Sequence, residues 1–173
     1  MASLQQWEVP LDQLSELQIR ALRYWQDLKG DREMPEAKEF ELMKLPTAAL
    51  RMTLLVDVLS EGEDFNYRFW GSGFWDYMGY DLTGKTVSGH IMPEAIRPSI
   101  LSAFRKVYRE RREIAMVSKL IRGDSNAIGF QQIIRYPLMS PEGEVSQIFS
   151  HIEFLHDQFE AQKFYEEIAV GNI

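Results

Sequence analysis

The chain has 173 residues, a formal net charge of −7 and a pI near 5.0. This acidic balance disfavours nucleic acid and an anionic membrane surface as partners, because both need a positively charged protein surface. No apolar run reaches the ~20 residues of a membrane helix, and MASLQQWEVP lacks the basic and apolar regions of a signal peptide. The absence of cysteine excludes disulfides, thiolate metal sites and cysteine catalysis. We therefore predict a cytoplasmic protein with no nucleic-acid or membrane partner.

The N-terminal part predicts an amphipathic helix from about Leu11 to Lys29, because apolar residues recur there at helical spacing. Pro10 suits the first turn of this helix and Gly30 suits its C-terminal end. A terminal helix of this composition either covers a sheet or buries a dimer seam. We predict that its apolar stripe is a face for a homodimer or a partner protein, formed by Leu14, Leu17, Ala21, Leu22 and Trp25.

The middle of the chain carries strand signals followed by helix signals. Alternating and β-branched apolar residues predict strands at 52–58 and 65–70, joined by a hairpin turn at Glu61-Gly62. A short helix at 74–78 and a longer helix at 96–111 follow. The two strands are therefore expected to be antiparallel neighbours, with the helices crossing the sheet after them.

The last third of the chain returns to the two-residue period of strands. We predict strands at 113–122, 127–140 and 145–154, joined by turns of a few residues. Turns this short make the three strands an antiparallel meander. A final helix is predicted from Gln158 to Ala169, with Asp157 as its N-cap.

The predicted fold class is α+β, with five strands in one antiparallel sheet, helices packed on one of its faces and a helix flanking each end. The helices between the second and third strands must cross the sheet and cover that face. We divide the chain into an N-terminal helix and linker at 1–40, a central domain at 41–155 and a C-terminal helix at 156–173.

One stretch, GYDLTGKT at 79–86, matches the spacing of a Walker A phosphate loop. Such a loop follows a buried strand and opens a helix, whose N-terminus faces the phosphates. Here the aromatic stretch SGFWDYM precedes the motif, and Gly89 and Pro93 break any helix after it. Asp81 would also repel phosphate. We interpret the motif as a turn bounded by glycines.

Three stretches resemble motifs of the PAS-domain family, in the family's order. YRFWGSGFWDYMGYDLTGKTV resembles the "yRlvG…g.dltGr" pattern of small stand-alone PAS proteins, LRYWQDLKGDREMP resembles their lead-in, and RYPLMSPEGEVSQIF resembles their hairpin. The resemblance covers residues 15 to 155. It implies a PAS-like sheet that holds a small ligand under its helices, or none. It also implies that changes pass through flanking helices to a separate signalling partner protein, and that the chain forms a homodimer.

The cofactor of such a domain stays unknown from these residues. Without cysteine, the chain cannot form the flavin adduct or the thioester-linked chromophore of some PAS proteins. His90 is a candidate haem ligand, although a lone histidine is more often a capped or surface residue. His151 and His156 are five residues apart, which is not a compact chelating pair, so no metal site is predicted.

Aromatic residues crowd into 65–78, where they form either core or the wall of an apolar pocket. Gln132 interrupts an apolar strand in register with Ile134, so it should point inward and need hydrogen-bond partners. We predict Gln132 as the anchor of a ligand, with a backbone or water partner as the alternative. The predicted pocket consists of Tyr67, Phe69, Trp70, Phe74, Trp75, Tyr77, Met78, His90, Phe104, Met116, Gln132, Ile134 and Tyr136.

We predict a small-molecule sensing or signal-transduction module and not an enzyme. The first alternative is a ligand-free dimeric adaptor that works through its terminal helices. The second is a small enzyme on a cone-shaped α+β barrel, which would need an inward acid/base pair. Only Tyr67 and Tyr136 are placed for that role, and neither has an evident partner residue.

Overall fold

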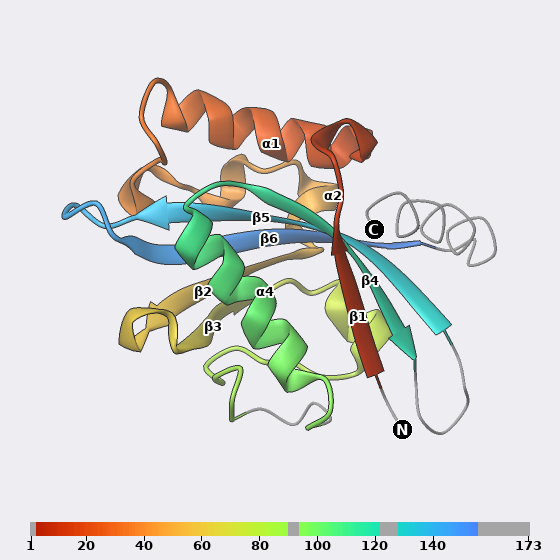
Figure 1. Cartoon of the computed structure of the whole chain (residues 1–173). Helices are drawn as coiled ribbons and strands as arrows, with labels where there is room; N and C mark the ends of the chain where they lie inside the picture. The colour runs from red at the N-terminus through yellow and green to blue at the C-terminus, as the bar shows by residue number, and fades with distance from the viewer. Residues whose placement is uncertain (1–2, 90–93, 122–127, 156–173) are drawn as a thin grey trace.

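The structure is a computed structural model that describes residues 3–89, 94–121 and 128–155. Six strands form one antiparallel sheet in the order β1-β4-β5-β6-β2-β3 (Figure 1). The strands are β1 (Ser3–Glu8), β2 (Thr53–Leu59), β3 (Asp64–Trp70), β4 (Ile114–Ile121), β5 (Ile128–Met139) and β6 (Val145–Leu155).

The described ranges contain four α-helices and several single turns of 3-10 helix. The α-helices are α1 (Glu16–Lys29), α2 (Thr47–Leu50), α3 (Phe74–Met78) and α4 (Arg97–Glu110). The 3-10 turns are Leu11–Gln13, Ala37–Glu39, Leu42–Lys44 and Ser60–Gly62. None of the described helices is both long enough and apolar enough to cross a membrane. The predicted final helix at 158–169 lies outside the described residues.

The sheet has one strand more than the predicted five. The additional strand, β1, lies at the edge of the sheet beside β4, with Trp7 opposite Val117 and Glu8 opposite Met116. An edge strand is paired on one side only, so it does not need the dense apolar run of a central strand. The mostly polar stretch SLQQWE therefore gave no strand signal. The other five strands are confirmed, including the hairpin turn before β3.

Helices cover both faces of the sheet, whereas the prediction placed them on one. We call the face under α4 the inner face and the face under α1 the outer face; the two helices lie on opposite sides of the sheet in Figure 1. Phe104 of α4 packs on Phe65 from the inner face, at 5.0 Å between ring centroids. Trp25 of α1 packs on Tyr136 from the outer face, at 6.0 Å. Both faces carry apolar side chains, so both need a cover.

The outer cover begins at a capped helix N-terminus. The helix predicted from Leu11 divides into a 3-10 turn and α1, because Ser15 caps α1. The Ser15 hydroxyl accepts a hydrogen bond from the backbone N–H of Gln18, and the Gln18 side chain accepts one from the backbone N–H of Ser15. The Ser15 hydroxyl also donates to the Glu153 carboxylate on β6, at 2.6 Å. This cap ties the start of α1 to the sheet.

The Walker-like motif is a turn, as predicted. Its backbone pairs with β3: the N–H of Tyr67 donates to the carbonyl of Lys85 at 2.9 Å, and the N–H of Gly84 donates to the carbonyl of Tyr67 at 2.7 Å. Asp81 accepts hydrogen bonds from the backbone and hydroxyl of Thr83 within the turn. No helix opens at Thr86 in the described residues up to 89. The segment therefore lacks the helix N-terminus that a phosphate loop requires.

The link from β3 to α3 depends on a close backbone approach at Gly71. A Cβ atom there would lie 2.3 Å from the carbonyl oxygen of Arg51 and 2.7 Å from that of Thr53. We expect Gly71→Ala to lower the free energy of unfolding by about 1–3 kcal/mol, because the backbone must shift to relieve this contact. Urea unfolding measures the loss.

The matched control is Gly129→Ala on β5, where nothing lies within 4 Å of the added Cβ. We expect this change to be neutral or slightly stabilising, because alanine restricts the unfolded chain. An equal loss of stability in both variants would show that the contact at Gly71 does not constrain the fold.

Candidate functional site

The sheet divides the predicted pocket residues into two groups. The inner face carries Tyr67, Trp70, Phe74, Phe104 and Met116, either on its strands or on the helices that cover it. The outer face carries Phe69, Gln132, Ile134 and Tyr136. Strand periodicity identifies residues that share a face but does not identify the helix that covers them. The predicted set therefore does not come together as one pocket.

Three further residues of the set lie on α3, and one is not described. Trp75 and Tyr77 are 60% and 40% exposed, and Met78 packs partly against the core. The Tyr77 ring stacks on Phe154 of β6, with 4.0 Å between ring centroids. His90 lies outside the described residues. Trp75 and Tyr77 therefore do not lie among the buried aromatic residues of the inner face.

Gln132 points to the outer face and is held by the chain's own backbone. Its side-chain amide donates to the carbonyl of Gln13 at 2.7 Å, and its backbone carbonyl accepts a hydrogen bond from the Gln18 side chain at 3.1 Å. Its amide thus connects β5 to the segment that leads into α1. This is the backbone-partner alternative that the sequence left open.

The two tyrosines of the enzyme hypothesis lie on opposite faces of the sheet. The Tyr136 hydroxyl donates to the carbonyl of Gln18 at 3.4 Å, under α1, whereas Tyr67 lies on the face under α4. Burial raises the pKa of both hydroxyls, so both are neutral near pH 7. They do not form an acid/base pair across one site.

The predicted partner face covers this chain's own sheet. Four of its five members are buried there, namely Leu14, Ala21, Leu22 and Trp25, while Leu17 is half-buried. The indole N–H of Trp25 donates to the carbonyl of Pro137 at 2.9 Å, which fixes α1 against β5. The apolar stripe of α1 is therefore used within the chain and is not free to form a dimer seam.

Arg135 is the feature of the inner face that sequence reasoning missed. It is only 4% exposed and lies under α4, with its guanidinium carbon 5.0 Å from the centre of the Phe104 ring. Its Nη1 donates to the Met116 sulfur at 3.6 Å, and its Nε has no hydrogen-bond partner. Among the described residues no carboxylate pairs with it. The sequence signal was a charged residue in the apolar stretch IIRYPLM.

Two hydroxyl groups lie on the same face as Arg135. Ser150 stands directly opposite Arg135 in the β5–β6 register, and its buried Oγ has no hydrogen-bond partner. Tyr67 interacts electrostatically with the guanidinium. Burial lowers the pKa of Arg135 to about 10. The group is therefore still a cation at pH 7, enclosed among aromatic and aliphatic side chains.

A groove lies at the surface between α4 and β1. Its volume is about 370 Å³, and its lining consists of Gln6, Pro98, Ser99, Ser102, Ala103, Lys106 and Met116. Met116 is shared: it lines the groove and also contacts Arg135. Gln6 could not be found from the sequence, because the strand that carries it was not predicted.

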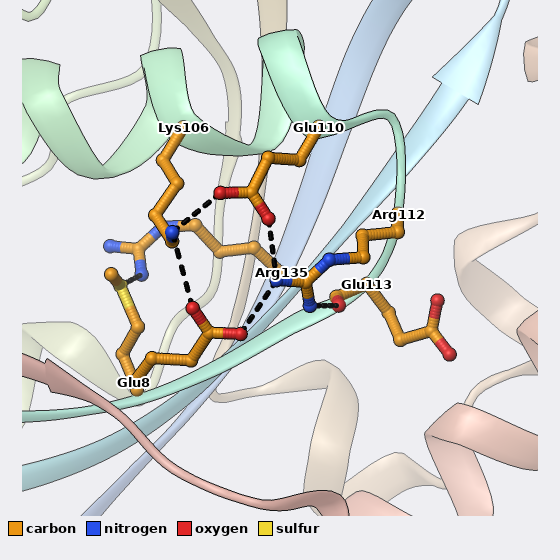
Figure 2. Close-up of polar contacts among 7 residues, drawn as sticks. Glu8, Lys106, Glu110, Arg112, Glu113 and Arg135 are labelled. Atoms are coloured by element: carbon orange, nitrogen blue, oxygen red, sulfur yellow. Dashed lines mark hydrogen bonds and ion pairs between the residues drawn. The ribbon is translucent and has the colours of Figure 1, made fainter. Parts of the chain in front are cut away.

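Four charged residues form a closed ion network beside the groove (Figure 2). Glu8 of β1 contacts Lys106 of α4 at 3.2 Å and Arg112 at 2.7 Å, and Glu110 contacts the same two cations. We call Glu8, Lys106, Glu110 and Arg112 the ion quartet. Burial raises the pKa of Glu8, but hydrogen bonds from Arg112 and Lys106 outweigh it and lower the pKa overall. The two negative and two positive charges neutralise one another.

No metal centre is found among residues 3–89, 94–121 and 128–155: no three His, Asp or Glu side chains there come together around one point. His151 is buried on the outer face with both ring nitrogens unbonded, and the nearest carboxylate oxygen, on Glu153, lies 3.6 Å from its Nε2. His156 lies outside the described residues. The prediction of no metal site is thus untested for the whole chain.

The chain belongs to the PAS domain family. The family model, described as a PAS domain, matches residues 13–153, which include the whole sheet except β1 and the end of β6. A comparison with curated proteins finds no match.

Comparison with solved structures gives the same fold. A light-oxygen-voltage domain from work on a flavin analogue matches with a TM-score of 0.53 and 18% identity, covering 77% of this chain and 98% of that one. The dark structure of the Aureochrome1 LOV photoreceptor matches with a TM-score of 0.51 and 14% identity, covering 75% and 94%. An RNA-binding light-oxygen-voltage receptor matches with a TM-score of 0.51 and 14% identity, covering 99% of this chain and 44% of that one.

We expect His151 to make stability depend on pH. Burial lowers its pKa to about 4, below the 6.5 of an exposed histidine. As the pH falls below 6.5 the unfolded chain takes up a proton that the folded chain does not bind, so stability falls with pH between about 6.5 and 4. The loss from pH 7.5 to pH 5 attributable to this residue should be about 2 kcal/mol.

The variant His151→Leu should remove this part of the pH dependence. Urea unfolding of both proteins at pH 7.5 and pH 5 isolates it, because the carboxylates titrate in both proteins alike. Equal losses of unfolding free energy in the two proteins would contradict the assignment.

Proposed function

We propose that this chain is a PAS sensing module that binds a small molecule in the groove between α4 and β1 and acts through a separate partner protein. Membership of the PAS family supports a sensing or signal-transduction role. The observation that carries the ligand is the groove, because its lining combines the apolar residues Pro98, Ala103 and Met116 with polar groups on Gln6, Ser99, Ser102 and Lys106. In small-molecule sites polar groups fix the orientation of the ligand while apolar side chains contact its body.

The light-oxygen-voltage neighbours raise flavin as a candidate ligand, but the residues of this chain do not fit one. The chain has no cysteine to form an adduct. The space between α4 and the sheet is also occupied, since Phe65 packs on Phe104 at 5.0 Å and Arg135 lies over the same ring at 5.0 Å. We therefore propose a ligand smaller than a flavin, bound at the groove.

The proposed route of the signal begins at β1. Gln6 of this strand lines the groove, and the chain continues from Glu8 through Pro10 to α1 on the opposite face. A ligand that displaces Gln6 acts on the strand that precedes α1. The adaptor alternative has less support, because the apolar stripe of α1 covers this chain's own sheet. Action on a partner and formation of a homodimer remain predictions.

We expect Ser102→Trp to abolish retention of a small molecule by the freshly purified protein. Ser102 is an exposed residue of α4 that lines the groove, so an indole there fills the space without disturbing the core. Native mass spectrometry detects the bound molecule as added mass on the folded chain. The wild-type protein should carry the added mass and the variant should lose it.

The control is Arg109→Trp, which places the same side chain at an exposed position of α4 that does not line the groove. This variant should retain the molecule at the wild-type ratio. Retention by Ser102→Trp, or a wild-type protein that never carries a small molecule from cells or from a metabolite library, would refute the groove as a ligand site.

A further inference from the structure

We propose that the ligand of the groove is a small organic monocarboxylate, whose negative group replaces the Met116 sulfur as the partner of Arg135. The proposal rests on the proposed function, namely that the groove binds a small molecule. It goes further by naming the chemical class of the ligand and the residue that selects it. The argument depends on Arg135, Ser150 and Met116 on the inner face.

The first step is that the partners of Arg135 are too weak for a buried cation. A buried guanidinium loses its hydration and is normally compensated by a carboxylate or a phosphate. Here Nη1 has a thioether sulfur, which is a weak acceptor, and the Phe104 ring supplies a cation–π contact. The Nε–H has no acceptor at all. The two terminal nitrogens, Nη1 and Nη2, form a planar donor edge that matches the two oxygens of a carboxylate.

The second step is that no described anion neutralises Arg135. The acidic residues nearest the groove, Glu8 and Glu110, are already paired with Lys106 and Arg112 within the ion quartet. Tyr67 interacts with the guanidinium, but its hydroxyl is neutral at pH 7. Within residues 3–89, 94–121 and 128–155, Arg135 is therefore a positive charge of the inner face that no carboxylate compensates. Ser150 adds a buried hydroxyl that also has no partner.

The third step is that a ligand in the groove can reach the guanidinium of Arg135. Met116 lies between the groove and the guanidinium, because it lines the first and contacts the second. An unbranched thioether side chain changes rotamer easily and leaves no charged group behind. Turning Met116 aside would expose the Nη1 edge of Arg135 to the groove.

The residues around the groove favour a ligand with one negative charge over a ligand with several. Pro98, Ala103 and Met116 give the groove an apolar part that suits a hydrocarbon body. One guanidinium compensates one negative charge, and Lys106, the other cation at the groove, is already paired with Glu8 and Glu110. A dianion such as phosphate is therefore disfavoured. The chemistry that fits is one carboxylate on a small apolar or aromatic body.

The test compares matched acids and amides on the full chain. Benzoate and hexanoate should raise the thermal midpoint of the wild-type protein in a concentration-dependent way, whereas benzamide, hexanamide and inorganic phosphate should not. Arg135→Met keeps the length of the side chain and removes the charge. This variant should be at least as stable as the wild type without ligand, and should show no shift with either acid.

Arg68→Met is the control for net charge. Arg68 lies on β3 in an ion pair with Asp57 at 2.7 Å, and its side chain is 58% exposed. It should show the wild-type shift with benzoate. Should Arg135→Met fail to fold, Arg135→Lys provides the second measurement. It keeps the charge but loses the planar donor edge, so its affinity for benzoate by calorimetry should fall at least tenfold.

The outcomes separate this proposal from the proposed function. Equal shifts with benzoate and benzamide, an unchanged shift in Arg135→Met, or unchanged affinity in Arg135→Lys would overturn the carboxylate and leave the groove as a ligand site. A shift with phosphate that Arg135→Met abolishes would overturn the monocarboxylate in favour of a phosphate ligand. If neither acid shifts the wild type while native mass spectrometry finds a neutral molecule lost in Ser102→Trp, the ligand class is wrong and the function stands. If nothing binds in either experiment, both proposals fail.

Discussion

The guanidinium of Arg135 is a full positive charge enclosed under α4, and the arrangement around it sets what the inner face of this PAS domain can do. A cation in this position is held by the packing of α4 on the sheet and not by an ion pair, since its contacts are an aromatic ring and a sulfur atom. Such contacts stabilise a guanidinium less than a carboxylate does. Among the described residues, the charge of Arg135 is therefore left without an anionic partner.

The contacts on the outer face are the reason why the proposed signal route begins at β1 and not at α1. Gln18, Trp25 and Ser15 connect α1 to the backbone or side chains of β5 and β6 through hydrogen bonds. This fixed helix is joined by a few residues to β1, which is an edge strand and pairs only with β4. One continuous segment thus lines the groove on one face and covers the sheet on the other. In the proposed route, a change at Gln6 reaches the outer face along the chain itself.

Much of this fold could be predicted from the sequence, because period and turn chemistry are local properties. The five strands of the central domain, the short helix at 74–78 and the glycine-bounded turn are all present. The edge strand β1 could not be predicted from SLQQWE, because its pairing with β4 is a contact between distant segments. The surroundings of Gln132 could not be predicted for a related reason. Strand alternation places Gln132 on the same face as Ile134 and Tyr136, but only the fold shows that α1 covers that face.

The candidate site was less predictable than the fold, and the ion quartet shows why. Lys106 and Arg135 are both basic residues near the groove, and nothing in their sequence neighbourhoods ranks one above the other. In the structure Lys106 is a partly exposed member of a neutral network, whose charges gain little from one another in water. Arg135 is buried and unpaired, so its charge acts across a medium of lower polarizability and is felt more strongly. Burial, and not residue type, distinguishes Arg135 from Lys106. Burial is decided by contacts of α4 with four strands, from β1 near the start of the chain to β6 near its end.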